Sequence, residues 1–164
     1  MGERTLILDD ARMARTVERM AWQILERHAS SERLVLAGIR NSGYALAERI
    51  YAHLQAHTAV ELMELEVNKR EPSLHDTRAS LDPALLEGAH VVVVDDVLNS
   101  GATLLYGVAH FLTARVGRIT TAVLVDRNHK RFPVKADIKG LSLSTGLHER
   151  VEVDWSTPCA TYLV

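Results

Sequence analysis

The chain has 164 residues, of which 47% are hydrophobic and only 5% aromatic, and its 19 basic and 21 acidic side chains give a formal charge of −2. This length predicts one domain over residues 1–164, able to bury about two-thirds of its unfolded surface. The balanced charge excludes a general attraction to nucleic acid but leaves a local basic patch open. A lone cysteine, Cys159, excludes an internal disulfide framework and is compatible with a reducing compartment. Because no apolar run reaches membrane-spanning length, we expect a cytoplasmic protein without membrane contact.

The first predicted elements are a short strand or extended arm at Leu6–Leu8 and a helix that begins after an N-cap at Asp9 or Asp10. An apolar residue recurs every three or four positions along this helix, so one face is expected to pack against the core. That stripe consists of Met13, Val17, Met20, Ala21, Ile24 and Leu25.

A second strand is predicted at Arg33–Ile39, and a second helix opens at Gly43. The loop between them, Gly38–Gly43, has glycine at both ends and the cation Arg40 inside, so its backbone amides and Arg40 are candidates to hold an anion. The two residues after the loop lack the Lys and the Ser or Thr of a Walker A loop, which argues against a nucleoside triphosphatase. A plain strand-to-helix turn is the alternative.

Val60–Val67 is a more polar strand candidate and is expected near a sheet edge. The segment that follows, residues 68–81, has no hydrophobic period and is rich in charged and turn-forming residues, which predicts a mobile loop. It carries Lys69, Arg70 and Arg78. The functional interpretation is a lid that closes over a polyphosphate, and the alternative is a solvated loop.

The most informative stretch is Val91–Thr103. Its four consecutive valines predict a strand buried on both faces, as in parallel sheets. Asp95 and Asp96 follow and are expected to mark the exit of this strand into water, although such acids also occur in ordinary charged turns. The small residues after them predict a tight loop whose amides converge on an anion, with Thr103 capping the next helix. The loop residues are Asn99, Ser100, Gly101, Ala102 and Thr103.

Ile119–Val125 predicts another buried strand and completes an alternation of strands and helices. The fold class is therefore α/β, with right-handed crossovers and a mostly parallel twisted sheet flanked by helices. Residues 126–140 then concentrate cationic side chains. Val151–Val153 and Ala160–Val164 predict closing strands.

Val91–Thr103 resembles the phosphoribosyl pyrophosphate (PRPP) signature of type I phosphoribosyltransferases. The resemblance implies their fold, with a flexible loop and a small C-terminal hood. In that family the paired acids hold the ribose hydroxyls and the loop amides hold the 5′-phosphate, roles that fall here on Asp95, Asp96 and residues 99–103. Mg²⁺, the implied cofactor, would contact Asp95 and Asp96 directly or through water.

The stretches 124–129 and 132–137, followed by Gly140, resemble a narrower family, the PyrR proteins, which are bacterial pyrimidine operon regulators and uracil phosphoribosyltransferases. This resemblance implies transfer of ribose 5-phosphate from PRPP to a nucleobase, uracil first, with release of pyrophosphate. It also implies PRPP, a nucleobase or a nucleoside monophosphate as ligands and a homo-oligomer, a dimer or larger, as the assembly. The implied site comprises Asp95, Asp96, Arg70 and Lys69 for catalysis, Arg40, Asn41, Ser42 and Gly43 for pyrophosphate, and Ile138 and Lys139 for the base.

The chain departs from the family pattern at several of these positions. Ser42 and Ala102 replace arginines, Asn99 replaces an aromatic residue, and Ile138 stands where an aromatic ring stacks on the base. The departures spare ribose binding and affect phosphate affinity and base choice. The family's RNA attenuation needs a basic face, which a charge of −2 does not obviously provide. Our hypothesis is therefore the enzyme. The alternatives are a nucleotide-sensing, RNA-binding regulator with weak or no transferase activity, and a phosphatase or nucleotide site without PRPP.

Overall fold

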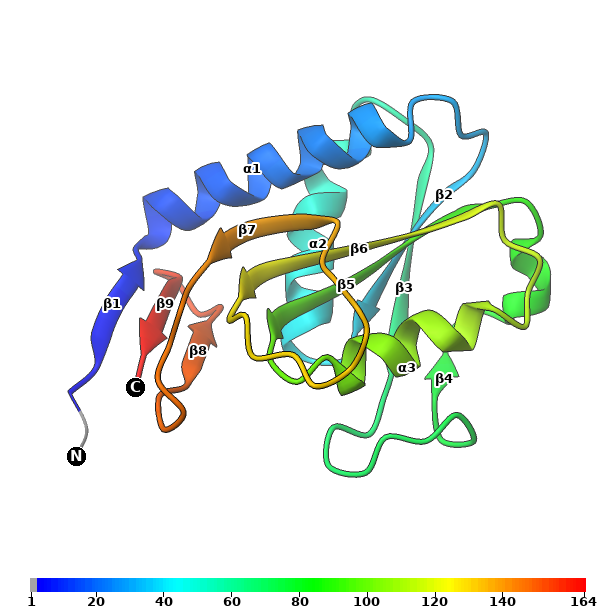
Figure 1. The fold of residues 1–164 in the computed structure, drawn as a ribbon. Helices are drawn as coiled ribbons and strands as arrows, with labels where there is room; N and C mark the ends of the chain where they lie inside the picture. Colours follow the sequence, from blue (N-terminus) through cyan, green and yellow to red (C-terminus); the bar gives the residue numbers. More distant parts are fainter. Residues whose placement is uncertain (1–2) are drawn as a thin grey trace.

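The computed structural model describes residues 3–164, so the first two residues of the expected domain lie outside the described part. A six-stranded sheet lies between helices, and a three-stranded sheet stands beside it (Figure 1). The elements in chain order are β1 (Thr5–Leu8), α1 (Asp10–Arg27), β2 (Leu34–Ile39), α2 (Ser42–Leu54), β3 (Val60–Glu66), β4 (Arg78–Ala79), the 3₁₀ helix η1 (Pro83–Leu86), β5 (His90–Leu98), α3 (Ala102–Phe111), β6 (Arg118–Asp126), β7 (Ile138–Ser142), β8 (Val151–Asp154) and β9 (Ala160–Leu163).

The large sheet has the strand order β4-β3-β2-β5-β6-β7, and every neighbouring pair is parallel except β3 and β4. The predicted α/β class with a mostly parallel sheet is therefore confirmed. The polar strand β3 lies near the edge as expected, covered only by the two-residue β4. Because Arg78–Ala79 forms that edge strand, the segment 68–81 is not wholly without regular structure, in contrast to the prediction.

Alternate residues of the central strand β5 face the two layers of helices. Val92 and Val94 pack with α1 and α2, whereas Val91 and Val93 pack on the side of α3. All four valines are fully buried, and each such burial stabilises the fold by about 1.5–3 kcal/mol. The apolar run predicted to be buried on both faces is thus the centre of the molecule.

Helix α1 begins where its sequence indicated. The Asp9 side chain is the N-cap and accepts a hydrogen bond from the Arg12 backbone N–H at 2.8 Å. The predicted stripe faces the core, and of its members only Leu25 is half-buried rather than buried. None of the helices within residues 3–164 combines the length and apolar character needed to cross a bilayer.

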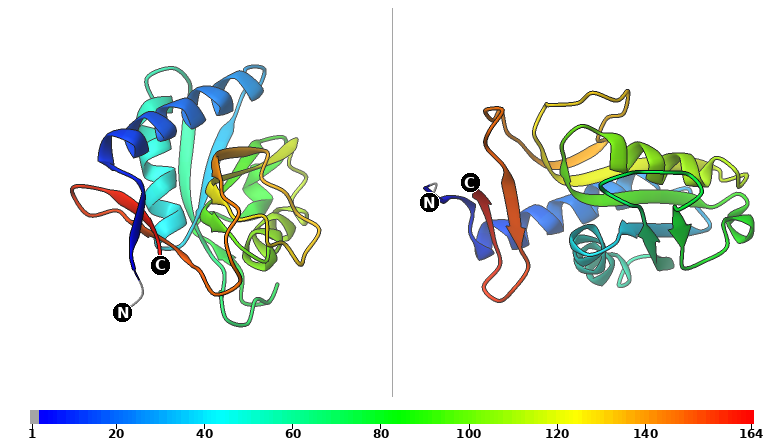
Figure 2. Two further views of the ribbon diagram at one scale, coloured as in Figure 1. Left: turned by 60° about the vertical axis from the view of Figure 1, so that its left-hand side comes forward. Right: turned by 90° about the horizontal axis from the view of Figure 1, so that it is seen from below.

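The predicted strands at both ends of the chain form a sheet of their own, with the order β1-β9-β8. Its strands are antiparallel, and Thr5 lies opposite Leu163. Figure 2 shows this small sheet at one side of the central sheet, beyond the ends of its strands. It corresponds to the C-terminal hood that the family resemblance implied, and it includes the N-terminal strand, which was not expected there.

Candidate functional site

A cavity of about 350 Å³ lies at the carboxyl end of β5, where the strand passes into α3. This is the edge of a parallel sheet at which ligands bind in open α/β folds. Val151 of β8 also reaches the cavity, so the hood contributes to its wall, which the sequence did not indicate. The predicted residues that line the cavity are Lys69, Asp95, Asp96, Asn99, Ser100, Gly101 and Thr103.

The prediction that the two acids mark the exit of the strand into water is wrong, because both lie within β5. Strand β5 continues to Leu98, and Asp95 is only 4% exposed. Asp95 Oδ1 accepts a hydrogen bond from the Asp96 backbone N–H at 2.9 Å, and Lys69 Nζ lies 3.7 Å from Asp95 Oδ1 and 4.0 Å from Asp96 Oδ1. Burial, and next the charge of Asp96, raise the pKa of Asp95 well above its usual value, while Lys69 acts in the opposite direction.

The loop after β5 turns at a glycine. Gly101 has a φ of +89°, and a Cβ there would lie 2.6 Å from Val134 Cγ1, so this position suits only glycine. The helix begins at Ala102 with Gly101 as its N-cap, which corrects the prediction that Thr103 caps it. Ser100 Oγ accepts a hydrogen bond from the Ala102 N–H at 3.3 Å. The N-terminus of α3 thus opens onto the cavity, an arrangement that favours an anion.

Arg127, the residue after β6, holds this loop through hydrogen bonds, a role that sequence reasoning did not assign. Its guanidinium donates to Asn99 Oδ1 at 2.7 Å, to Thr145 Oγ1 at 2.9 Å and to the Glu149 carbonyl at 2.5 Å. The only sequence signal was its place in the stretch 124–129 that carries the family resemblance. The Arg127 side chain therefore joins the loop after β5 to the segment that leads to β8.

The loop before α2 reaches the same site through its last glycine. A Cβ on Gly43 would lie 2.8 Å from the Val94 carbonyl oxygen and 3.0 Å from Asp95 Cα, so only glycine allows this approach. The φ of Asn41 is 71°, in the region that residues other than glycine rarely adopt. Arg40 is held apart from the acids, because its guanidinium lies 3.1 Å from Glu66 Oε1 and 3.8 Å from Glu64 Oε1.

Of the two loop cations assigned to catalysis, Lys69 and Arg70, only Lys69 contacts the acids. The Arg70 side chain is exposed, and its backbone N–H donates to Asn68 Oδ1 at 3.0 Å in a turn that also includes Glu71. The structure therefore brings Lys69 to the cavity and leaves Arg70 in solvent, and Arg78, the third cation of the predicted lid, is exposed on β4.

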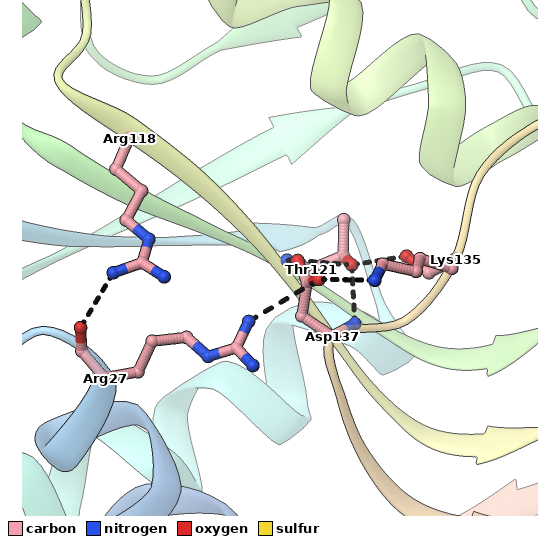
Figure 3. Close-up of polar contacts among 5 residues, drawn as sticks. All are labelled: Arg27, Arg118, Thr121, Lys135 and Asp137. Atoms are coloured by element: carbon pink, nitrogen blue, oxygen red, sulfur yellow. Dashed lines mark hydrogen bonds and ion pairs between the residues drawn. The ribbon is translucent and has the colours of Figure 1, made fainter.

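The predicted base-binding pair lies at the start of β7, two strands from the acids, and the register places Lys139 level with Asp95. Ile138 is 4% exposed and belongs to the core between the sheet and α1, so its side chain is not presented to the cavity. Asp137 holds it there: its carboxylate accepts the Thr121 N–H at 3.0 Å and lies 3.5 Å from the guanidinium of Arg27, as Figure 3 shows. Lys139 Nζ lies 3.4 Å from Asp126 Oδ2, at the carboxyl end of β6.

The residues at the cavity fit a magnesium ion that also binds substrate phosphates. Carboxylate oxygens are the ligands that Mg²⁺ prefers, and such sites use one or two carboxylates together with the phosphates. Within residues 3–164, no three acidic, histidine or cysteine side chains gather as a cage of their own. Asp95 and Asp96 are the two carboxylates that line the cavity, and the Lys69 ammonium group lies within 4.0 Å of both.

Comparison with known proteins agrees with this geometry. The phosphoribosyl transferase domain family matches residues 4–156. The chain is 35% identical over 151 residues to the bifunctional protein PyrR of Streptococcus thermophilus, covering 90% of this chain and 87% of that protein. It is 35% identical over 158 residues to the pyrimidine operon regulatory protein of Lactococcus lactis, covering 93% and 91%.

The solved structures extend the likeness to the fold. The hypoxanthine phosphoribosyltransferase of Trypanosoma cruzi superposes with a TM-score of 0.73 at 20% identity, covering 90% of this chain and 84% of that one. A hypoxanthine phosphoribosyltransferase from Staphylococcus aureus gives a TM-score of 0.71 at 16% identity, covering 84% and 76%. With the match over residues 4–156 and the PyrR relatives, the conclusion is that this chain belongs to the type I phosphoribosyltransferase family.

Proposed function

We propose that the protein is a PyrR-like phosphoribosyltransferase that transfers ribose 5-phosphate from PRPP to a nucleobase, uracil first, and releases pyrophosphate. The observation that supports this most strongly is one cavity that holds paired carboxylates, a lysine and a helix N-terminus. Each group suits one part of PRPP. The carboxylates suit the ribose hydroxyls, the α3 N-terminus suits the 5′-phosphate, and the ammonium suits the diphosphate.

The reaction asks the protein mainly for positioning and charge stabilisation. The bond from ribose C1 to pyrophosphate breaks, pyrophosphate takes the electron pair, and a ring nitrogen of the base forms the new bond and loses its proton. Positive charge builds on the ribose as the first bond loosens. We assign stabilisation of that charge, through the ribose hydroxyls, to Asp96 and the ionised form of Asp95, and exclusion of water to closure of the loop after β3 over bound PRPP.

Charge on the departing pyrophosphate needs cations. We assign neutralisation of this charge to Lys69, Arg70 and Arg40. Arg40 must leave its ion pairs with Glu64 and Glu66 in order to bind the ligand. When bound, Mg²⁺ held by Asp95, Asp96 and PRPP oxygens supplies further neutralisation of the diphosphate. The backbone amides of residues 41–43 and 99–103, the latter at the start of α3, complete the proposed phosphate contacts.

For the base we retain Lys139 and not the side chain of Ile138. Lys139 lies near the end of β6, at the same edge of the sheet as the cavity, because Asp126, its ion-pair partner, lies opposite Leu98 of β5. Ile138 packs into the core and offers no ring face for stacking. Base affinity therefore has to come from hydrogen bonds more than from stacking.

The test is calorimetric titration with Mg-PRPP, followed by a transfer assay with uracil, hypoxanthine and guanine. We expect PRPP to bind in a Mg²⁺-dependent manner and uracil to be converted to its nucleoside monophosphate. Absence of PRPP binding would contradict the proposal. Turnover of a purine base but not of uracil would keep the transferase and change the substrate.

A regulator that senses nucleotides and binds RNA is the second candidate. It is favoured by the curated relative named as a pyrimidine operon regulatory protein and by the cationic segment 126–140. Because the net charge is −2, we expect few released counterions and weak RNA binding at physiological salt. Anisotropy titration with pyrimidine-operon leader RNA decides between them, since tight sequence-specific binding without uracil transfer would favour the regulator. For either function we propose a cytoplasmic homo-oligomer.

A further inference from the structure

A hydrogen bond joins the small sheet to the loop before α2. Trp155, the residue after β8, donates from Nε1 to Ser42 Oγ at 2.7 Å. Ser42 opens α2 directly after Asn41, whose positive φ stores strain of about 1–3 kcal/mol, and the Asn41 side chain makes no capping hydrogen bond. A strained turn of this kind persists only where its surroundings hold it. Trp155 is one of the groups that hold it.

Arg49 fixes the indole from the other side. Its guanidinium lies 4.6 Å from the centre of the Trp155 ring and donates to the Trp155 carbonyl at 3.1 Å. The same side chain donates to the Ala45 carbonyl at 3.2 Å, in the first turns of α2. Trp155 is therefore attached to α2 at two points, through Ser42 and through Arg49.

Strand β8 carries this attachment to the cavity. Val151 at one end of β8 lines the space that contains the acids, and Trp155 follows the other end. Gly43, next to Ser42, abuts Asp95, since a Cβ there would lie 3.0 Å from Asp95 Oδ1. The hydrogen bond thus lies between the hood and the part of the loop nearest the acids.

We propose that Trp155 is a positioning residue for the pyrophosphate group, which it serves by orienting the hydroxyl of Ser42. This inference rests on the proposed function. An indole N–H only donates, so the Ser42 oxygen must act as its acceptor. The hydroxyl keeps its own proton for donation, and a hydroxyl that accepts one hydrogen bond is a stronger donor in the next. Ser42 then donates to a diphosphate oxygen at a place where the family pattern has an arginine.

The experiment measures the affinities of Mg-pyrophosphate, Mg-PRPP and uridine 5′-monophosphate for wild-type protein, Trp155→Phe, Ser42→Ala and the double variant. Phenylalanine keeps an aromatic ring near Arg49 and removes the N–H donor together with two ring carbons of the indole. We expect each single variant to weaken pyrophosphate and PRPP binding about two- to tenfold, the loss of one hydrogen bond, and to leave the monophosphate unchanged. The double variant should lose no more affinity for pyrophosphate and PRPP than Ser42→Ala alone, because both substitutions interrupt the same series of hydrogen bonds from Trp155 through Ser42 to the ligand.

Trp22→Phe is the matched control, because Trp22 is 50% exposed on α1 and the same atoms are removed. It should bind all three ligands as wild type does. It also leaves Trp155 as the sole indole, whose fluorescence should change with pyrophosphate and not with the monophosphate. If Trp155→Phe does not fold, Ser42→Ala carries the test and must show the same selective loss.

The outcomes separate this inference from the function on which it rests. Wild-type protein that binds neither PRPP nor pyrophosphate would overturn both. PRPP binding in the wild type with equal pyrophosphate affinity in Trp155→Phe and Ser42→Ala would overturn the role of Trp155 alone. So would an equal loss of pyrophosphate and monophosphate binding, which indicates a general structural defect.

Discussion

Lys69 Nζ lies 3.7 Å from Asp95 Oδ1 and 4.0 Å from Asp96 Oδ1, so one cation of the loop after β3 contacts both acids at the end of β5. A ligand hydroxyl or a metal ion that takes these carboxylates must compete with the ammonium group. We expect a displaced Lys69 to become available to a phosphate. We therefore propose that binding at the acids is coupled to the position of residues 68–81.

The acids themselves should decide PRPP affinity. Asp95→Asn and Asp96→Asn each replace a charge-assisted hydrogen bond to a ribose hydroxyl with a neutral one, at a cost of about 1.5–3 kcal/mol or roughly 10- to 100-fold in the dissociation constant. Calorimetric titration with Mg-PRPP measures this. Glu87→Gln, an exposed change far from the cavity, is the control and should bind as wild type. Equal affinity in all four proteins would contradict the ribose-site assignment.

Asp95→Asn should also make the free protein more stable at neutral and alkaline pH. The folded-state pKa of Asp95 is raised by burial and by Asp96, so the charged form is unfavourable in the folded state. This penalty is fully present above the folded-state pKa and disappears as the pH falls toward the lower pKa of the unfolded chain. Asparagine removes the charge and keeps an acceptor for the Asp96 N–H.

Urea unfolding at pH 8 and pH 5 tests that expectation. The difference in unfolding free energy between Asp95→Asn and wild type should be positive at pH 8 and smaller at pH 5. A variant that is less stable than wild type at both values would show that the ion pair with Lys69 outweighs the burial of the charge.

The loop after β3 should become protected when PRPP binds. Residues 68–77 form no helix or strand, and Lys69 and Arg70 are both exposed, so trypsin should cut there readily in the free protein. Saturating Mg-PRPP should slow the cleavage, because a closed lid shields the backbone. A cleavage rate that PRPP leaves unchanged would argue that the loop is only solvated, and Mg²⁺ alone serves as the control.

Gly43→Ala should disturb both halves of the site at once. Its Cβ would lie 2.8 Å from the Val94 carbonyl oxygen and 3.0 Å from Asp95 Cα, and these backbone atoms belong to the central strand and yield little. We expect a loss of about 1–3 kcal/mol in stability and weaker binding of PRPP. Gly146→Ala is the matched control, since its Cβ would meet only the flexible side chain of Glu149. Unaltered PRPP affinity in Gly43→Ala would show that the loop does not need this close approach.

The structural features that depend on local sequence pattern were predicted correctly. Val91–Val94 lie in a buried strand and the Met13 stripe faces the core, because apolar spacing alone sets which face is buried. The paired acids, the small residues of the loop and Lys69 were likewise identified as candidates from residue type and order, and the structure gathers them at one cavity.

The remaining features depend on contacts between distant residues. Asp95 is buried because Gly43 and Lys69 pack against it from other elements, which the local pattern of a strand that ends in acids does not show. Thr103 was wrongly expected to cap α3, since the turn ends at Gly101, whose φ is positive and which is the N-cap two residues earlier. The bond from Trp155 to Ser42 spans 113 positions and leaves no mark in either local sequence.

The pairing of β1 with β9 has a consequence for protein synthesis. Thr5 pairs with Leu163 and Leu6 with Tyr162, so β1 has no partner in this sheet until β9 has been synthesised. The parallel sheet can assemble earlier, because its strands follow one another along the chain. Strand β8 also pairs with β9, so Val151 and Trp155 take their places only when translation has passed residue 163. We therefore expect the wall of the cavity that includes Val151 to be completed only after β9 leaves the exit tunnel.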